Sequence, residues 1–401
     1  MRETVQEPIP IEQARALVLE RVRPLPPERV PLAEAAGRVL AEDARSVVDL
    51  PPFASSAMDG FALRAADAPG TLPIVARIAA GRPAGAPLGP GEAMEISTGG
   101  VVPEGADAVI PVEYVVEHDN SVEIPPDVEP GANVRPRGGD VAEGDVVARR
   151  GMLLGPAQLG ALAAAGVAQV VCARRPRAAV LTTGTELRAP GEQLGPGEVY
   201  EANSIIIAAQ LAAAGAEVER LAPVVDDEDA HREAIARGLA SDIFITTGGV
   251  SVGPHDLVRR IEAELGVEEV FWRIAVRPGK PVAFGLRGDT LVFGLPGNPV
   301  SSLVGFELFV RPAVHALQGM DDPGPRFLPG RLGRPERRNP GRDNLVRART
   351  KTDGDEVVLE PLSGQDSHMI VCAAAADALV LIPRGEGVVE AGAPVRYLRL
   401  A

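Results

Sequence analysis

The chain has 401 residues, a formal net charge of −15, 45% hydrophobic residues and only 3% aromatic residues. This length allows about two to four domains, whose cores must be built mainly from Val, Leu, Ile and Ala. The negative charge argues against nucleic acid as a partner, because phosphate binding needs a basic face, and it requires any anion site to be locally positive.

Nothing in the sequence points to a membrane or to export. No apolar run of about 18 residues or more is free of charges and breakers, so we expect no transmembrane helix. The N-terminus carries Glu3, Glu7 and Glu12 and lacks the basic start and apolar core of a signal peptide. Cys172 and Cys372 lie far apart in apolar surroundings, which favours two buried thiols over a disulfide. We therefore expect a cytoplasmic protein.

The N-terminal part of the chain alternates between helical and β-like segments. Residues 11–22 and 32–40 are predicted to be helical, and an Ala-rich helix is expected at 155–165. Between them, Gly and Pro separate short β-like runs at residues 74–78, 94–96, 108–116 and 121–124. This order predicts a helical linking domain, formed by residues 1–45 with 141–176, and a β-rich domain of residues 46–140 inserted into it.

The second half predicts an α/β domain at residues 177–323 and a small C-terminal β-barrel domain at residues 324–401. Strands are expected at 178–181, 217–225 and 243–246, and helices at 204–214, 229–239, 257–265 and 303–317. Such alternation is typical of a parallel sheet covered by helices, with ligands at the carboxyl ends of its strands. After a Pro/Gly/Arg linker at 324–338, β segments are expected at 344–350, 356–360, 378–382 and 395–400.

Three glycine loops follow predicted strands of the α/β domain. They contain Thr182-Thr183-Gly184, Thr247-Gly248-Gly249-Val250-Ser251 and Pro296-Gly297-Asn298. Glycine leaves backbone N–H groups free to face a bound anion, so these loops indicate a site for a phosphorylated or oxyanionic ligand. Each loop alone is also compatible with an ordinary strand-to-helix turn, and none matches the Walker or dinucleotide-binding patterns.

Charged residues accompany these loops. The turn from Arg277 to Pro281 carries two cations, including Lys280, and is either an anion clamp or a solvated turn. Glu186, Asp226 and Asp256 each follow a predicted strand, as expected of carboxylates that hold Mg²⁺ at one sheet edge. The alternative for Asp226 is a charge that complements the dipole of the following helix.

Several longer motifs resemble one known family. Residues 247–253, 278–281 and 294–302 are similar to motifs of the molybdopterin molybdenumtransferases, the MoeA and gephyrin E-domain family. In the N-terminal half, residues 50–62, 98–100 and 103–109 are similar to that family's other hallmark segments. The resemblance covers nearly the whole chain in collinear order. One departure is Arg277, where many family members have lysine.

The resemblance implies an enzyme that inserts molybdenum from molybdate into adenylylated molybdopterin, with Mg²⁺, and releases AMP. It implies catalytic roles for Asp59, Glu186, Asp226 and Asp256, the last three of which would also hold the metal. A turn in which Asp59 caps its own backbone is the alternative for that residue. The substrate-binding residues implied are Thr98, Thr183, Gly184, Gly248, Gly249, Val250, Ser251, Arg277, Lys280, Pro281, Pro296, Gly297, Asn298, Ser301, Arg347 and Ser367.

The resemblance also implies a homodimer, with a molybdopterin adenylyltransferase and molybdoenzyme chaperones as further possible partners. Neither nucleic acid nor a membrane is expected as a partner. Three alternatives stay open: an insertase specific for tungstate, a non-catalytic scaffold of the gephyrin type, and a hydrolase that acts on a nucleotide.

Overall fold

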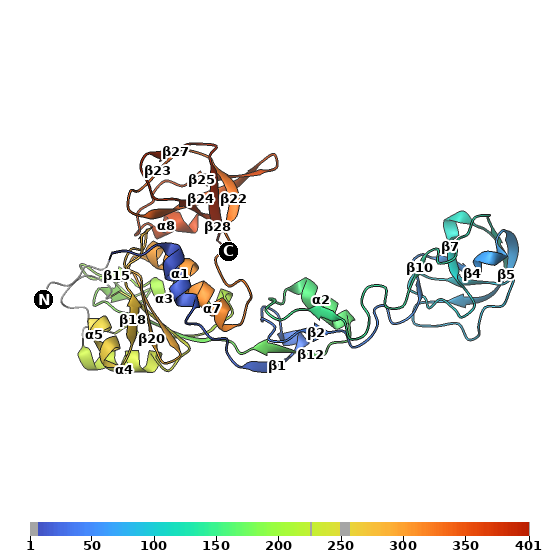
Figure 1. Cartoon of the computed structure of the whole chain (residues 1–401), viewed down its shortest axis with the longest axis horizontal. Helices are drawn as coiled ribbons and strands as arrows, with labels where there is room; N and C mark the ends of the chain where they lie inside the picture. Colours follow the sequence, from blue (N-terminus) through green and yellow to red (C-terminus); the bar gives the residue numbers. More distant parts are fainter. Residues whose placement is uncertain (1–6, 225–226, 249–256, 401) are drawn as a thin grey trace. The chain divides into compact units, whose positions relative to one another are not determined.

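The computed structural model describes residues 7–224, 227–248 and 257–400, and Figure 1 shows the course of the chain. Its residues divide into two compact units. The first unit contains Met1–Glu28, Gly37–Ala41 and Cys172–Ala401, and the second unit contains Arg29–Ala36 and Glu42–Val171. The boundaries of the four domains expected from the sequence stay a prediction.

The second unit is built around a six-stranded sheet in the order β7-β4-β6-β5-β9-β8. The strands are β4 (Gly60–Leu63), β5 (Gly70–Ile78), β6 (Ala93–Ile96), β7 (Ala108–Pro111), β8 (Val116–His118) and β9 (Ser121–Ile124). Phe61, Leu72 and Ile124 are among the buried side chains of its core. The β-rich character expected for this region is confirmed. The single strand expected at 108–116 is instead two strands, separated by the 3₁₀ turn η3 (Val112–Tyr114).

Short elements complete the second unit and its junctions. They are β1 (Pro27–Pro31), η1 (Leu32–Glu34), β2 (Ala44–Arg45), β3 (Ser55–Ser56), η2 (Ala65–Asp67), β10 (Val134–Arg135), β11 (Val146–Ala148), α2 (Pro156–Ala164) and β12 (Gln169–Ala173). The helix expected at 32–40 is wrong, because only one 3₁₀ turn forms and Leu40 pairs with Cys172 as an antiparallel β-bridge. Tertiary pairing here overrides the helix propensity of an Ala-rich segment.

The centre of the first unit is a six-stranded sheet in the order β16-β13-β17-β21-β20-β18. The strands are β13 (Arg177–Thr182), β16 (Glu217–Arg220), β17 (Ile243–Thr247), β18 (Glu268–Phe271), β20 (Ala283–Arg287) and β21 (Thr290–Leu295). The first four strands in this order are parallel, as predicted. At the other end of the sheet, β20 pairs antiparallel with β21, and β18 pairs antiparallel with β20. A short pair, β14 (Leu187–Arg188) and β15 (Val199–Tyr200), follows β13 in the chain.

Helices cover both faces of this sheet. The helices are α1 (Ile11–Leu19), α3 (Asn203–Ala213), α4 (Glu228–Gly238), α5 (Leu257–Glu264), α6 (Pro299–Gly305), the π-helical turn η4 (Phe306–Val310) and α7 (Arg311–Leu317). Side chains alternate along the strands, so Ile243 and Ile245 pack with α1, α3, α6 and α7. Phe244 points to the other face and packs with α4 and α5. The result is a three-layer α/β arrangement.

One helical stretch, Pro299–Leu317, combines α6, η4 and α7. Within the described residues it is the one helix long and apolar enough to cross a membrane by length and composition, and 72% of its apolar window is buried inside the structure. Phe306, Leu308 and Phe309 are fully buried in the core beneath the sheet. Burial against the sheet thus accounts for the apolar composition of this helix.

The C-terminal segment forms a closed five-stranded barrel in the order β24-β25-β22-β28-β26, with β26 returning to β24. Its elements are β22 (Leu328–Leu332), β23 (Glu336–Arg337), β24 (Asp343–Asp353), β25 (Glu356–Pro361), α8 (Ile370–Ala374), β26 (Ala378–Ile382), β27 (Val388–Val389) and β28 (Pro394–Arg399). The linker expected at 324–338 is therefore wrong, since it contains β22 and β23. A further strand, β19 (Val276–Arg277), comes from the α/β part and pairs with β24.

Candidate functional site

The three glycine loops meet at one edge of the central sheet. In the strand register, Thr182 of β13 lies beside Thr247 of β17, and Thr247 lies beside Leu295 of β21. Thr183 continues this pattern, because its N–H donates to the Thr247 carbonyl at 3.1 Å. The carboxyl ends of these parallel strands therefore deliver their loops to the same place. The expected convergence is confirmed for the described residues.

Gly248 is at a position where a side chain would not fit. Its φ is +86°, and a Cβ atom at this residue would lie 2.5 Å from the carbonyl oxygen of Thr183. Among the described residues, a Cβ atom on Gly297 would meet the Cα atom of Gly248 at 3.8 Å, an ordinary van der Waals contact. The absence of a side chain at Gly248 thus allows the β17 loop to approach the β13 loop.

Asn203, at the start of α3, links two of these loops. Its Nδ2 donates to the Gly297 carbonyl at 2.8 Å and to Thr247 Oγ1 at 3.3 Å. The Gly297 carbonyl can only accept, so this contact fixes the orientation of the carboxamide. Nothing in the sequence pattern distinguished this buried asparagine, and its role follows from the pairing of distant loops.

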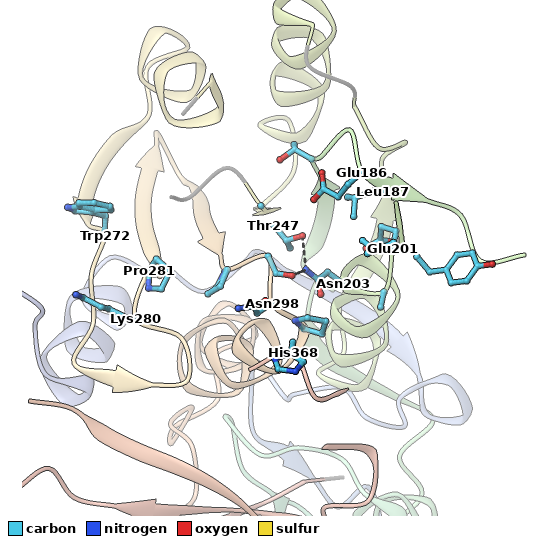
Figure 2. Close-up of a pocket in the computed structure, with 18 of the residues that line it drawn as sticks. Glu186, Leu187, Glu201, Asn203, Thr247, Trp272, Lys280, Pro281, Asn298 and His368 are labelled. Atoms are coloured by element: carbon cyan, nitrogen blue, oxygen red, sulfur yellow. Dashed lines mark hydrogen bonds between the residues drawn. The ribbon is translucent and has the colours of Figure 1, made fainter. Parts of the chain in front are cut away.

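A pocket of about 770 Å³ opens over the glycine loops (Figure 2). Figure 2 shows Lys280 and Trp272 on one side of it, Glu186 and Glu201 on the other, and Asn298 between them. The sequence-predicted residues that line it are Thr183, Glu186, Gly248, Lys280, Pro281, Pro296, Gly297 and Asn298. It is also lined by residues that were not among the expected site residues, namely Leu187, Val199, Tyr200, Glu201, Ala202, Asn203, Thr247, Trp272, Arg273, Pro299 and His368.

A smaller pocket, of about 370 Å³, adjoins the large one. The two pockets share Lys280, Pro281, Pro296, Asn298 and His368. The predicted residues that line the small pocket are Arg277, Lys280, Pro281, Pro296, Asn298, Ser301 and Ser367. Pro278, Gly279, Arg342, Gln365, Asp366 and His368 complete its wall. The structure therefore brings the predicted cationic turn together with Ser367, which lies far away in the sequence.

Hydrogen bonds join the barrel to the α/β sheet at this small pocket. Asn298 Nδ2 donates to Ser367 Oγ at 2.9 Å, and the Val300 N–H donates to the Ser367 carbonyl at 3.2 Å. Ser301, in the first turn of α6, is buried. The Ser367 loop is thus fixed against the start of α6.

Two cations of the small pocket, Arg277 and Lys280, have no ion-pair partner among the residues that the structure describes. The side chains of Arg277 and Lys280 are exposed and form neither an ion pair nor a hydrogen bond with any residue that the structure describes. In contrast, the half-buried Arg174 forms two hydrogen bonds of 2.9 Å with Asp242. Free cations around a cavity, in a chain of net charge −15, favour a bound anion.

Arg347, like Gly184, is a predicted site residue of the first unit that lines neither pocket. It is 2% exposed, and its guanidinium group donates to the carbonyls of Gly364, Asp366 and Met369 at 2.7, 3.1 and 3.0 Å. A further contact of 3.3 Å joins its Nε to Gln365 Oε1. The structure therefore places Arg347 behind the small pocket, where it holds the loop that carries Ser367.

Asp59 and Thr98 lie together in the second unit. The N–H and hydroxyl of Thr98 donate to Asp59 Oδ1 at 2.6 and 3.0 Å. The backbone hydrogen bond from Thr98, followed by its hydroxyl, lowers the pKa of the exposed Asp59 carboxyl. Asp59 thus caps a distant loop and not its own backbone, and its expected share in catalysis stays a prediction.

The structure describes only some of the residues expected to bind the metal and the substrate. Asp226, Asp256, Gly249, Val250 and Ser251 lie outside the described residues. Of the expected metal ligands, the exposed Glu186 lies at the large pocket. The nearby Glu201 is buried and accepts the N–H and hydroxyl of Ser204 at 2.7 and 2.6 Å, so its carboxylate already caps α3. Among the described residues no group of three or more metal-ligating side chains forms.

Glycine loops at one edge of an α/β sheet, with a large pocket beside a small cationic one, are typical of the class of proteins that bind phosphorylated ligands. Family models match the chain along its length. "MoeA N-terminal region (domain I and II)" matches residues 9–166, "Probable molybdopterin binding domain" matches 179–316, and "MoeA C-terminal region (domain IV)" matches 329–400. The chain belongs to the MoeA family of molybdopterin molybdenumtransferases.

Individual relatives agree with this assignment. The chain is 37% identical to molybdopterin molybdenumtransferase 2 of Mycobacterium tuberculosis, over 96% of this chain and 97% of that protein. It is 40% identical to molybdopterin molybdenumtransferase of Haemophilus influenzae, over 77% of this chain and 78% of that protein. A crystal structure of a molybdopterin biosynthesis MoeA protein from Pyrococcus horikoshii OT3 superimposes with a TM-score of 0.84 at 28% identity, covering 98% of this chain and 100% of that chain.

Proposed function

We propose that this chain inserts molybdenum from molybdate into adenylylated molybdopterin and releases AMP. The observation that carries this proposal is the pair of adjoining pockets, which share Lys280 and Asn298. The large pocket has room for an organic substrate of nucleotide size, and the small cationic pocket suits a compact oxyanion. Their shared wall would hold the two reactants beside each other, which is the main requirement of a transfer reaction.

The chemistry assigned to the protein is positioning and charge neutralisation. Backbone N–H groups of the glycine loops face phosphate oxygens, and the ammonium group of Lys280 stabilises negative charge at the boundary of the two pockets. The hydroxyls of Ser301 and Ser367 and the amide of Asn298 supply further donors around the oxyanion. No covalent intermediate on a protein nucleophile is needed for this scheme.

Four further features expected from the family resemblance belong to this proposal. The free carboxylate of Glu186, with Asp226 and Asp256, would hold Mg²⁺, which when bound supplies charge neutralisation for the pyrophosphate group. The second unit would contribute Asp59 and Thr98, within a homodimer. We also propose a cytoplasmic location and exchange of substrate and product with a molybdopterin adenylyltransferase and with molybdoenzyme chaperones.

The test is AMP release from adenylylated molybdopterin, with Mg²⁺, in the presence and absence of molybdate. Wild type should release AMP when micromolar molybdate is added, and Asp256→Ala and Lys280→Gln should lose this stimulation. The chain has only one other lysine, Lys351, which is exposed on β24 outside both pockets, so Lys351→Gln is a matched control that should behave as wild type. AMP release that never responds to molybdate would overturn the proposal. Stimulation by tungstate alone would instead favour a tungstate-specific insertase.

A further inference from the structure

The small pocket is built from two separate parts of the chain. The α/β part supplies the turn from Arg277 to Pro281, together with Ser301. The barrel supplies residues 365–368 and one cation that was not among the expected site residues, Arg342. The pocket is therefore incomplete without the barrel.

Backbone pairing fixes the position of Arg342 relative to Arg277. Strands β19 and β24 pair in parallel, so that Val276 lies beside Asp343 and Arg277 beside Asn344. The Asp343 N–H donates to the Ala275 carbonyl at 2.9 Å. Arg342 immediately precedes β24, so this pairing holds it near Arg277 at the same pocket.

The backbone on both sides of Arg342 is anchored. Before it, the Gly341 N–H donates to Asn339 Oδ1 at 3.0 Å. After it, Asp343 Oδ1 accepts the Arg384 N–H at 2.8 Å, so this neighbouring carboxylate is already engaged elsewhere. Arg342 thus lies in an anchored turn, and the acid that follows it in the sequence has another partner.

The guanidinium group of Arg342 lacks a protein partner. Although the residue is half-buried, it forms no ion pair and no hydrogen bond within the described parts of the chain. Some half-buried arginines are engaged, as Arg174 is with Asp242 and Arg311 is with Glu307 at 2.7 and 2.8 Å, whereas Arg15 has no partner among the described residues. What distinguishes Arg342 is its position at the wall of the small pocket beside Arg277 and Lys280, where an unpaired guanidinium group can form charge-assisted hydrogen bonds with an anion.

We propose that Arg342 is a third anion-binding cation of the small pocket and makes this pocket selective for a tetrahedral dianion. The inference rests on the proposed function and extends it to a residue that sets specificity. Arg277, Lys280 and Arg342 carry three positive charges, and Asp366 at the same pocket carries one negative charge. The surplus of two positive charges matches molybdate. The forked donors of a guanidinium group also fit two oxygens of one oxyanion.

The experiment measures calorimetric binding of molybdate and of perrhenate, a tetrahedral oxyanion with a single charge, to the full-length chain. Wild type should bind molybdate more tightly than perrhenate. Arg342→Gln should weaken molybdate binding roughly 10- to 100-fold, as expected for the loss of one charge-assisted contact, and weaken perrhenate binding much less. Arg342→Lys, which keeps the charge, should restore much of the preference for the dianion.

The matched control is Arg337→Gln. Arg337 is exposed on β23, close to Arg342 in the sequence, and does not line the pocket, so its loss changes the net charge equally. This control should bind molybdate as wild type does.

The outcomes separate the inference from the proposed function. If wild type binds molybdate and Arg342→Gln keeps both its affinity and its preference for the dianion, the inference is overturned and the proposed function stands. If Arg342→Gln loses both anions equally and Arg342→Lys does not recover the preference, Arg342 supports the structure of the pocket and does not set its charge selectivity. If wild type binds neither anion, the assignment of the small pocket fails, and both proposals fail with it.

Discussion

Replacing Arg347 with methionine separates two roles for a buried arginine at the rear of the small pocket. The structure gives it a positioning role, because its guanidinium group donates to the carbonyls of Gly364, Asp366 and Met369. Burial lowers the pKa of Arg347, and the nearby Cys372 and Asp366 act in the opposite direction. The family resemblance instead suggests direct contact with the oxyanion.

The cost of Arg347→Met follows from these contacts. An acceptor that is buried and left without a partner costs about 1–3 kcal/mol, and the carbonyls closest to solvent regain water. If one or two of these carbonyls keep no hydrogen-bond partner, we expect the free energy of unfolding to fall by about 3 kcal/mol. The loop that carries Ser367 should loosen as well, so molybdate affinity should fall together with stability.

Urea unfolding and calorimetric binding of molybdate, on the same preparations, test this reasoning. Arg349→Met is the control, since Arg349 lies on the same strand but is exposed and donates to a single carbonyl, that of Ala375, at 2.8 Å. It should change stability by less than about 1 kcal/mol. If Arg347→Met abolishes molybdate binding while the unfolding midpoint stays that of wild type, Arg347 acts on the anion directly and the positioning role is refuted.

Three further predictions concern the frame of the site and its pH dependence. Gly248→Ala should lower the free energy of unfolding by roughly 1–3 kcal/mol in chemical denaturation. The new Cβ atom would lie 2.5 Å from the Thr183 carbonyl oxygen, and residue 248 has a φ of +86°. A stability equal to that of wild type would contradict the packing of these loops. Asn203→Ala removes the donor to the Gly297 carbonyl at 2.8 Å and should cost about 1–2 kcal/mol in the same assay, whereas no loss would show that this link is dispensable. Burial, with Arg311 adding to its effect, lowers the pKa of His315 to about 4, below the unfolded value of 6.5. Between these two values the unfolded chain binds a proton that the folded chain does not. The contribution of His315 to the free energy of unfolding is therefore complete above pH 6.5 and should fall by about 3 kcal/mol as the pH drops towards 4. Urea unfolding of wild type and His315→Gln, measured between pH 6.5 and 4, should give free energies of unfolding that depend differently on pH. The same pH dependence in both proteins would contradict the assignment.

Much of the α/β region could be predicted from the sequence, because local and tertiary signals agree there. The run of β-branched and apolar residues that ends at Thr247 forms β17, and the amphipathic segment that begins near residue 229 forms α4. The barrel strand β22 was missed, since Pro329 and Gly330 look like strand breakers. In the structure, a Cβ atom on Gly330 would lie 2.3 Å from the end of the Leu359 side chain, so a larger residue here would require Leu359 to move. A single sequence does not reveal which glycines have such a packing reason.

The candidate site was predictable to the extent that its motifs are contiguous. Arg277, Lys280 and the glycine loops lie in short motifs of the sequence. Residues of these motifs, among those that the structure describes, line the two pockets. Arg342 and Asn203 were missed because each reaches the site through pairing with a distant segment. Arg347 lies on β24 between Val346 and Ala348, which pack in the barrel core, so its side chain points to the opposite side, towards the loop that carries Ser367. The sequence alone could not distinguish this position from a pocket-facing one.

The most direct test of the central claim is the metal content of the pterin product. Purified chain is incubated with adenylylated molybdopterin, Mg²⁺ and equimolar molybdate and tungstate, and the released pterin is separated and analysed by mass spectrometry. The account predicts molybdenum bound to the pterin in proportion to the AMP released, and loss of both in Lys280→Gln but not in Lys351→Gln. AMP released without any metal on the pterin would contradict the assignment of this chain as a molybdenum insertase.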